Sequence, residues 1–418
     1  MTYVEFFDRT SVENICACLS NVPEKVILIG SKDDESIMSK YIENYEKVFG
    51  ERKYTTEFIC EIVETWTIMG ITKKLEEILH TYNDCVFGIA GGDEMTMYAL
   101  GVFCGKQPEG TVQVHKVNVQ NSEIYDCDMD GKTIAHHTPK LSVKENIRIY
   151  GGDIIETAVD GNETNQWNMT PEYRQDIENM WSICKSGLAT WNQQIGLIKK
   201  SIELGTSSNE GLVIEANIKE IEDACKPSQL RPFFFDKLAR KKLLKTKWLP
   251  SEENAEKIRF IFKNEQVKKS LSQEGLALEL KIYSMCKYLR PGGNGYLYND
   301  VMNGVQIDWD GVIRKENEDY DTTNEIDVLL MHNMVPVFIS CKNSGTVEEE
   351  EFYKLCTVAE RFGGKYSKKV LVASQMTNKK RDRELKQKAF DMGIQIIAKE
   401  EVIEDSRLQK RLEEVWKL

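Results

Sequence analysis

The sequence lacks the apolar runs and cysteine patterns that mark membrane-spanning or disulfide-stapled proteins. Within its 418 residues, no apolar run approaches the roughly 20 residues that a membrane span requires. The eleven cysteines form no Cys-x-x-Cys pair and no regular frame, which is typical of reduced cysteines in a cytosolic protein. Met1–Thr10 opens with a strand-like segment rather than with a signal peptide. We therefore expect a globular, cytoplasmic protein that has no membrane partner.

The sequence also lacks the two best-known phosphate-binding motifs. Neither G-x-G-x-x-G nor G-x-x-x-x-G-K-[ST] occurs, and no internal repeat is present. The net charge of −12 argues against a protein that coats nucleic acid without specificity, but it permits an enzyme with a local basic stripe. Lys237–Lys247 is such a stripe, with six cationic residues in eleven positions. It either contacts a phosphate backbone or forms a solvated helix face balanced by acidic neighbours.

Strand and helix signals alternate through the first 119 residues. Strand-like, largely apolar segments recur with helical segments between them, at Tyr3–Phe7, Lys25–Gly30, Thr55–Cys60, Cys85–Ala90 and Val112–Val119. This alternation predicts a doubly wound, mostly parallel sheet, an α/β fold of the Rossmann type. Ligands of such sheets bind beyond the carboxyl ends of the strands, where the strand order reverses.

Two loops are expected to flank that point, one after the first strand and one after the fourth. In the second loop, two glycines precede a helix N-terminus, an arrangement that either binds an anion through free N–H groups or is an ordinary tight turn. The candidate ligand-binding residues are Asp8, Arg9, Thr10, Ser11, Gly91, Gly92, Asp93, Glu94 and Met95.

The centre of the chain is less regular. Short strands are expected on both sides of the turn Asp130-Gly131, followed by a polar linker at 160–168 and one long helix over Pro171–Ile202. A mixed segment then extends to about residue 270, with a helix over Phe234–Leu244, and could be winged-helix-like. We expect three domains, at 1–160, 161–271 and 272–418.

The C-terminal region is expected to be a second α/β unit. A helix from Ser272 to Leu289 carries Glu279, and short strands follow at Gly304–Ile307 and Gly311–Arg314. Two further strands, Ile326–Met331 and Val335–Cys341, form a hairpin. Helices and strands alternate again to the end of the chain.

The hairpin brings a carboxylate and a lysine together. Asp327 lies on its first strand and Lys342 just past its second, with Glu325 and Ser340 close by. A Mg²⁺- or Mn²⁺-dependent phosphodiester hydrolase needs a carboxylate that holds the hard cation and a lysine that stabilises charge or orients the attacking water. The same residues also fit a plain salt-bridged hairpin at a sheet edge.

Taken together, these residues resemble a known family. The order Glu279, Asp327 and Ser340-x-Lys342 resembles that of PD-(D/E)xK nucleases, and NEID followed by ISCKN resembles the variant in CARF-domain nucleases. The segments YVEFFD, KVILIG and the strand–Gly-Gly–helix block resemble the CARF half of those proteins. The closest resemblance is to single-chain CARF nucleases, the effectors of type III CRISPR antiviral defence.

The resemblance implies a sensor domain at 1–160 joined to a nuclease domain at 272–418. A cyclic oligoadenylate, usually the tetramer, would bind across the two-fold axis of a homodimer and activate metal-dependent cleavage of DNA, RNA or both. Asp327 would be the principal ligand of Mn²⁺ or Mg²⁺, with Glu279 as the helix-borne second carboxylate. Lys342 would be the catalytic lysine, Glu325 an accessory acid and the main-chain carbonyl of Cys341 a further metal ligand. Asp308 and Asp310 are spare acids.

Two positions depart from the family pattern and keep other functions open. Ser340 stands where the general pattern has an acid, which favours a non-catalytic regulator that binds nucleic acid. Asp93-Glu94 stand where many CARF domains have Thr-Lys, and two carboxylates repel a phosphate ligand unless adenine or ribose groups meet them. That pair favours a nuclease of the repair or restriction type, without a gate, in which the N-terminal domain serves for assembly.

Overall fold

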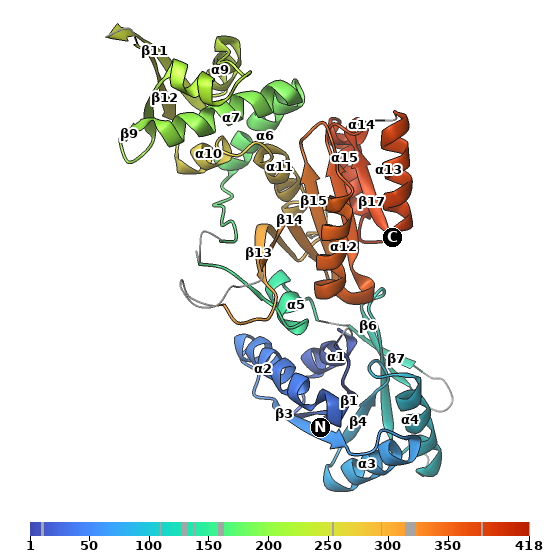
Figure 1. The fold of residues 1–418 in the computed structure, drawn as a ribbon. Coiled ribbons are helices and arrows are strands. Elements are labelled where there is room, and N and C mark those ends of the chain that lie inside the picture. Colours follow the sequence, from blue (N-terminus) through green and yellow to red (C-terminus); the bar gives the residue numbers. More distant parts are fainter. Residues whose placement is uncertain are drawn as a thin grey trace.

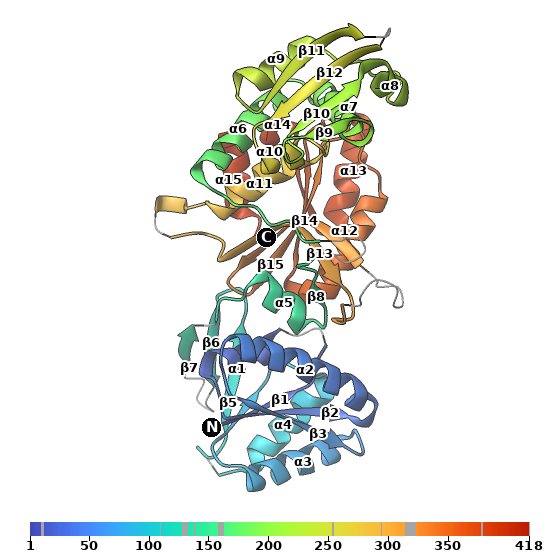
Figure 2. The same ribbon diagram turned by 90° about the vertical axis from the view of Figure 1, so that its left-hand side faces the viewer.

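In the described residues the computed structural model contains three β-sheets, and the C-terminal sheet lies between the other two (Figure 1). The N-terminal sheet lies at one end of the molecule and the sheet of the middle region at the other, as the turned view also shows (Figure 2). Backbone alone is described for 133–137, 250–252 and 255. The residues described by the structure are 1–9, 12–108, 110–127, 133–137, 139–157, 163–252, 255–293, 295–313, 323–377 and 379–417.

The N-terminal sheet has seven strands in the order β3-β2-β1-β4-β5-β6-β7. The first five strands of this order are parallel, and β6 and β7 join antiparallel at one edge. Its strands are β1 Thr2–Phe6, β2 Lys25–Ser31, β3 Glu57–Val63, β4 Cys85–Gly88, β5 Gln113–Asn118, β6 Glu123–Cys127 and β7 Thr133–His137. Its helices are α1 Glu13–Asn21, η1 Lys32–Asp34, α2 Glu35–Glu51, α3 Ile68–Thr81 and α4 Glu94–Lys106.

This sheet is the predicted doubly wound sheet, and its strand order reverses between β1 and β4. The two strands pair in parallel from Thr2 opposite Cys85 onward, so the loops that follow them meet at the switch point. The apolar run of β2 is buried as expected for a strand covered on both faces. The turn Asp130-Gly131 lies outside the described residues.

The middle region contains helices and a four-stranded antiparallel sheet in the order β11-β12-β10-β9. Its elements are α6 Pro171–Lys185, α7 Leu188–Leu204, β9 Thr206–Ser208, β10 Val213–Asn217, α8 Ile218–Ala224, α9 Pro232–Arg240, β11 Leu244–Glu252, β12 Ala255–Phe262 and α10 Glu265–Ser270.

The C-terminal sheet has six strands in the order β17-β16-β15-β14-β13-β8. A short segment before the middle region, α5 Val143–Ile149 and β8 Asp153–Ile154, supplies its edge strand. The other strands are β13 Asp300–Asp308, β14 Thr323–His332, β15 Val335–Lys342, β16 Lys368–Ala373 and β17 Ile394–Ala398. The helices are α11 Leu276–Lys287, η2 Pro291–Gly293, α12 Glu350–Gly363, η3 Gly364–Tyr366, α13 Lys380–Asp391, α14 Lys399–Val402 and α15 Asp405–Glu414.

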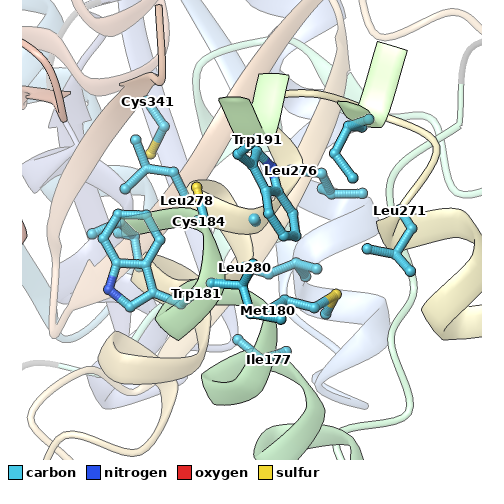
Figure 3. Packing of buried hydrophobic residues seen from close by; sticks show 14 of the residues in the cluster. Ile177, Met180, Trp181, Cys184, Trp191, Leu271, Leu276, Leu278, Leu280 and Cys341 are labelled. Atoms are coloured by element: carbon cyan, nitrogen blue, oxygen red, sulfur yellow. The ribbon is translucent and has the colours of Figure 1, made fainter. Parts of the chain in front are cut away.

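The long helix predicted over Pro171–Ile202 is wrong, because the chain breaks at Ser186-Gly187 into α6 and α7. Glycine lacks the side chain that would favour continuation of the helix. The break allows both helices to bury a tryptophan in one core, since Trp181 and Trp191 are each fully buried. Figure 3 shows these two rings packed near Leu278 and Leu280 of α11.

Two other element predictions also fail. The helix predicted over Phe234–Leu244 ends at Arg240, and a turn with a left-handed Lys242 leads into β11. The basic stripe therefore spans a helix end and a strand rather than one helix face. The strand predicted over Gly311–Arg314 is absent, because 311–313 form a turn and Arg314 lies outside the described residues.

Candidate active site and ligand site

The pairing of β14 with β15 determines which hairpin side chains share a face. Val328 lies opposite Ile339 and His332 opposite Val335. Continued beyond Val328 and Ile339, this register places Asp327 opposite Ser340 after one step and Glu325 opposite Lys342 after three steps. Directly opposed residues project to the same side of a sheet. The four predicted side chains therefore belong to one face and one end of the hairpin.

The regular pairing of β14 with β15 stops at Val328 and Ile339. Beyond this pair, the Asp327 carboxylate bonds to the main chain of β15. Its Oδ2 accepts a hydrogen bond from the main-chain N–H of Cys341 at 2.5 Å and one from the Ser340 hydroxyl at 3.3 Å. Ser340, which stands where the family pattern has an acid, thus donates to the Asp327 carboxylate. The Cys341 side chain points away into the hydrophobic core near Leu278 (Figure 3).

Asn303, which the sequence analysis did not identify, ties the two predicted metal-binding acids together. It is 1% exposed on β13, and its Nδ2 donates to the main-chain oxygen of Asp327 at 2.8 Å. It also forms a side-chain hydrogen bond with Glu279. Its Oδ1 accepts from the Trp167 indole at 2.7 Å. The described part of the segment predicted as a linker, 163–168, is therefore attached to the strand beside the site.

Burial and repulsion from neighbouring acids raise the pKa of both Glu279 and Asp327. Glu279 lies in the first turn of α11, which begins at Leu276 rather than at the predicted Ser272. Burial, followed by repulsion from Asp327 and Glu325, raises the pKa of Glu279 well above its usual value. Burial also raises the pKa of Asp327 to about 6, although the Cys341 N–H and Lys342 act in the opposite direction. Perturbed acids of this kind are typical of functional sites.

Lys342 is held by a second residue that the sequence did not reveal. Its Nζ lies 2.8 Å from Oε2 of Glu351, in the first turn of α12. Burial lowers the pKa of Lys342, but the bond to Glu351 and the nearby Asp327 outweigh this effect and raise it. The lysine is therefore protonated and can stabilise negative charge. A four-residue acidic run starting at Glu348 was the only sequence signal for Glu351.

The structure does not bring the spare acids into this cluster. Asp308 pairs across the sheet with Thr323, four residues before Asp327, which corresponds to about 13 Å along a strand. Oδ1 of Asp308 and Oδ1 of Asp310 each accept a hydrogen bond from the N–H of Val312 at 3.0 Å. These two acids order a turn.

The residues present fit a hard divalent cation. Among the described residues, no three His, Cys, Asp or Glu side chains lie close enough to hold a metal by themselves. Mg²⁺ is commonly held by only one or two carboxylates and retains several waters. Asp327 and Glu279 supply two neighbouring oxygen donors whose ionised forms repel each other, and a cation would remove that repulsion. The donor set is therefore suited to Mg²⁺ or Mn²⁺.

The loops at the switch point of the N-terminal sheet are packed closely together. A Cβ on Gly91 would lie 2.1 Å from the carbonyl oxygen of Phe6 and 2.4 Å from Nδ2 of Asn14. Glycine is therefore required where the loop after β4 meets the loop after β1. Gly92 has a φ of +85°, a conformation that glycine adopts without strain. Arg9 is half exposed, and its guanidinium lies 3.5 Å from Asp34. Asp8 is the preceding residue of the same loop, and Thr10 and Ser11 lie outside the described residues.

Asp93 has a structural role in its loop. It is the N-cap of α4, and its Oδ1 accepts from the N–H of Thr96 at 2.9 Å, while the Thr96 hydroxyl donates to the Asp93 carbonyl. One of the two carboxylates therefore points into the helix end instead of outward. Glu94 and Met95 are exposed at the same helix end.

Comparison with known proteins identifies the fold. No protein-family model matches the chain, and no curated protein matches it. Two of the solved structures that match do so over the full length of this chain. Protein VC1899 from Vibrio cholerae is 17% identical with a TM-score of 0.71, and the match covers 100% of this chain and 98% of that chain.

The second structure is Can2 from Sulfobacillus thermosulfidooxidans in complex with cyclic tetra-adenylate, which is 16% identical with a TM-score of 0.65. The match covers 100% of this chain and 97% of Can2. In the described residues no helix is long and apolar enough to cross a membrane. The N-terminal sheet, the middle region and the hairpin-bearing sheet all lie within the matched length, so the chain has the α/β fold of these two structures from end to end.

Proposed function

We propose that the protein is a metal-dependent endonuclease that a cyclic oligoadenylate activates, and that it acts in type III CRISPR antiviral defence. The observation that carries the proposal is the cluster at the end of the hairpin, where Asp327 and Lys342 both act on the pKa of Glu279 and each acts on the pKa of the other. Cyclic tetra-adenylate is the expected activator, because Can2 was solved with it. A cytoplasmic homodimer, DNA or RNA as substrate and the three-domain division at residues 160 and 271 remain part of the proposal.

The chain's own residues have distinct roles in this proposal. Asp327 and Glu279 would hold the cation, which when bound activates water and neutralises phosphate charge. Asn303 and the Cys341 N–H fix the position of Asp327. Lys342 remains protonated beside Glu351 and stabilises the charge that develops on the phosphate. Ser340 orients the Asp327 carboxylate, so an acid at that position is not needed for this role.

Contacts between the N-terminal and C-terminal sheets supply a physical route for activation. Glu13 in α1, close to the switch-point loop, is 3% exposed. It accepts a hydrogen bond from the Tyr366 hydroxyl at 2.6 Å and pairs with Lys365 at 2.8 Å. Both partners lie in η3, directly after α12, whose first turn holds Lys342 through Glu351. A shift of α1 would therefore be transmitted along α12 to the lysine.

The test is cleavage by Asp327→Asn and Lys342→Ala in Mn²⁺ with activator present. Each change is expected to lower the cleavage rate on the order of 10³-fold with an unchanged melting temperature. The matched controls are Asp391→Asn at the end of α13 and Lys354→Ala in α12, which alter exposed residues and should retain activity. Full activity in both site variants would remove these residues from the mechanism, and nucleic-acid binding without turnover in the wild type would favour a non-catalytic regulator.

A further inference from the structure

One face of the sheet in the middle region carries an unusual concentration of positive charge. The segment 231–263 contains ten Lys or Arg residues and four Asp or Glu residues, within a chain of net charge −12. In the pairing of β11 with β12, Lys245 lies opposite Ile261 and Lys247 opposite Arg259. Leu249 lies opposite Lys257. Alternation places all of these side chains on one face, called here the basic sheet face.

The basic sheet face is opposite the core. The other face of the same strands contributes Leu244, Ile258 and Phe260 to the hydrophobic core, and each is at most 1% exposed. Lys245, Lys247 and Lys257 are exposed. Among the side chains that the structure describes, none of these three lysines has an acidic partner within ion-pair distance, whereas Arg259 pairs with Glu215 on β10.

Like charges at this spacing repel one another. Neighbours two apart on one strand are separated by about 7 Å, and diagonal neighbours on paired strands by about 7–8 Å. These distances are below the Debye length of about 8 Å at physiological salt, so the repulsion is only partly screened. A polyanion that spans several lysines removes this repulsion and releases counterions as it binds.

We propose that the basic sheet face binds the sugar–phosphate backbone of the nucleic acid that the nuclease site cleaves. The proposal rests on the proposed function. The positive charge of this face complements the negative charge of a nucleic-acid backbone, and the fold connects the face to the candidate active site. Asn192 of α7 exchanges hydrogen bonds with Asn343, the residue after Lys342, at 2.8 and 2.9 Å. The same helix ends at Leu204 and leads directly into β9 of the basic sheet.

The connecting helix sets the length of substrate that is needed. From Asn192 to Leu204 are twelve helical residues, or about 18 Å, and the basic strands β12 and β11 lie two and three strands beyond β9, or about 10 and 14 Å further. The whole path corresponds to about eight to nine phosphate steps of 3.4 Å on a helical strand. A substrate of about 4 nucleotides is long enough only for the candidate active site. A single binding module covers about 4–16 nucleotides, so a substrate of about 30 nucleotides is long enough to contact both the active site and the basic sheet face. The basic sheet face therefore contributes only to the binding of long substrates.

The experiment compares full-length wild type with the triple variant Lys245→Gln, Lys247→Gln and Lys257→Gln. Cleavage is measured on oligonucleotides of about 4 and about 30 nucleotides, in DNA and RNA, with Mn²⁺ and the activator present. The matched control is a triple variant with glutamine at three exposed lysines outside the middle region: Lys40, Lys73 and Lys380.

For the long substrate, KM of the basic-face variant should rise roughly 10- to 50-fold near 0.15 M salt, while kcat is retained. The slope of log KM against the logarithm of the salt concentration should decrease by about 2, because each of the three lost phosphate contacts contributes about 0.7. Both constants for the short substrate should remain at the wild-type value. Equal KM values for the basic-face variant, the control and the wild type would overturn the proposal. Loss of cleavage by wild type on every substrate would instead contradict the proposed function.

Discussion

The two candidate sites use the same kind of residue, an acid in the first turn of a helix or at its cap, in opposite ways. Asp93 caps α4 at the protein surface through the N–H of Thr96, so its charge stabilises the fold. Glu279 in α11 is buried near Asp327 and Glu325, and its pKa is raised by burial and by their repulsion. The environment, rather than the residue type, therefore separates an acid with a raised pKa from an acid that caps a helix.

This difference predicts that neutralising Glu279 removes activity without loss of stability. Glu279→Gln should lower metal-dependent cleavage about 10²- to 10³-fold, because one hard oxygen donor is lost. The melting temperature of the metal-free variant should stay equal or rise, since a repelled buried charge is gone. The measurement combines cleavage kinetics with thermal melts, and Glu274→Gln, an exposed change just before the same helix, is the control. A destabilised and active variant would contradict the comparison.

The link between the two sites can be broken separately. Glu13→Gln removes the ion pair with Lys365, and Tyr366→Phe removes the hydroxyl that Glu13 accepts from. Each change should lower stimulation by the activator about tenfold, a coupling of about 1.4 kcal/mol, while cleavage without activator stays at the wild-type rate. Dose–response curves with cyclic tetra-adenylate measure this effect. If the activator stimulated cleavage by both variants as strongly as by the wild type, α12 would be excluded as the route from the N-terminal sheet to Lys342.

The pH dependence of cleavage tests the role proposed for Asp327 in the candidate active site. The Asp327 pKa is raised to about 6, so its metal-binding form is lost as pH falls through that value. Cleavage at subsaturating Mn²⁺ should fall about tenfold per pH unit below about 6. In the metal-free protein, Asp327 binds its proton more tightly in the folded state than in the unfolded state. Its contribution to the free energy of unfolding is therefore present at low pH and is lost as pH rises from about 4 to about 6. Cleavage that is flat down to pH of about 4.5 would contradict the assignment.

The smallest expected effect concerns the acid at the sensor loop. Asp93→Asn keeps a good N-cap but removes a negative charge, so the melting temperature should be unchanged while affinity for cyclic tetra-adenylate rises a few-fold. Asp93→Ala should lose about 1 kcal/mol of stability, since the cap is lost. Calorimetric titration and thermal melts measure the two effects. Unchanged affinity in Asp93→Asn would mean that this carboxylate does not face the ligand.

Much of the fold was predictable because its signals are local. The alternating apolar runs of the first 119 residues and the hairpin around Asp327 each follow from a period in the sequence, and the structure confirms both. The break at Ser186-Gly187 was missed because one glycine is tolerated in many helices. There, burial of Trp181 and Trp191 on separate helices determines the outcome.

The site itself was only partly predictable, for a physical reason. Asp327, Ser340 and Lys342 are close in sequence, so strand pairing alone predicts their proximity. Asn303 and Glu351 reach the same place from β13 and α12, and no periodic pattern marks a single polar residue that contacts distant main chain. Their partners depend on tertiary packing, which the sequence does not display directly.

The most direct test of the central claim is gated cleavage. The wild-type protein is incubated with Mn²⁺ and single-stranded DNA, single-stranded RNA or supercoiled plasmid, without ligand and with cyclic tri-, tetra- or hexa-adenylate. We expect cleavage only in the presence of one ring size, the tetramer, and none when the metal is chelated. Equal cleavage with and without every ligand would contradict the sensor assignment, and cleavage in chelator would contradict the metal-dependent site.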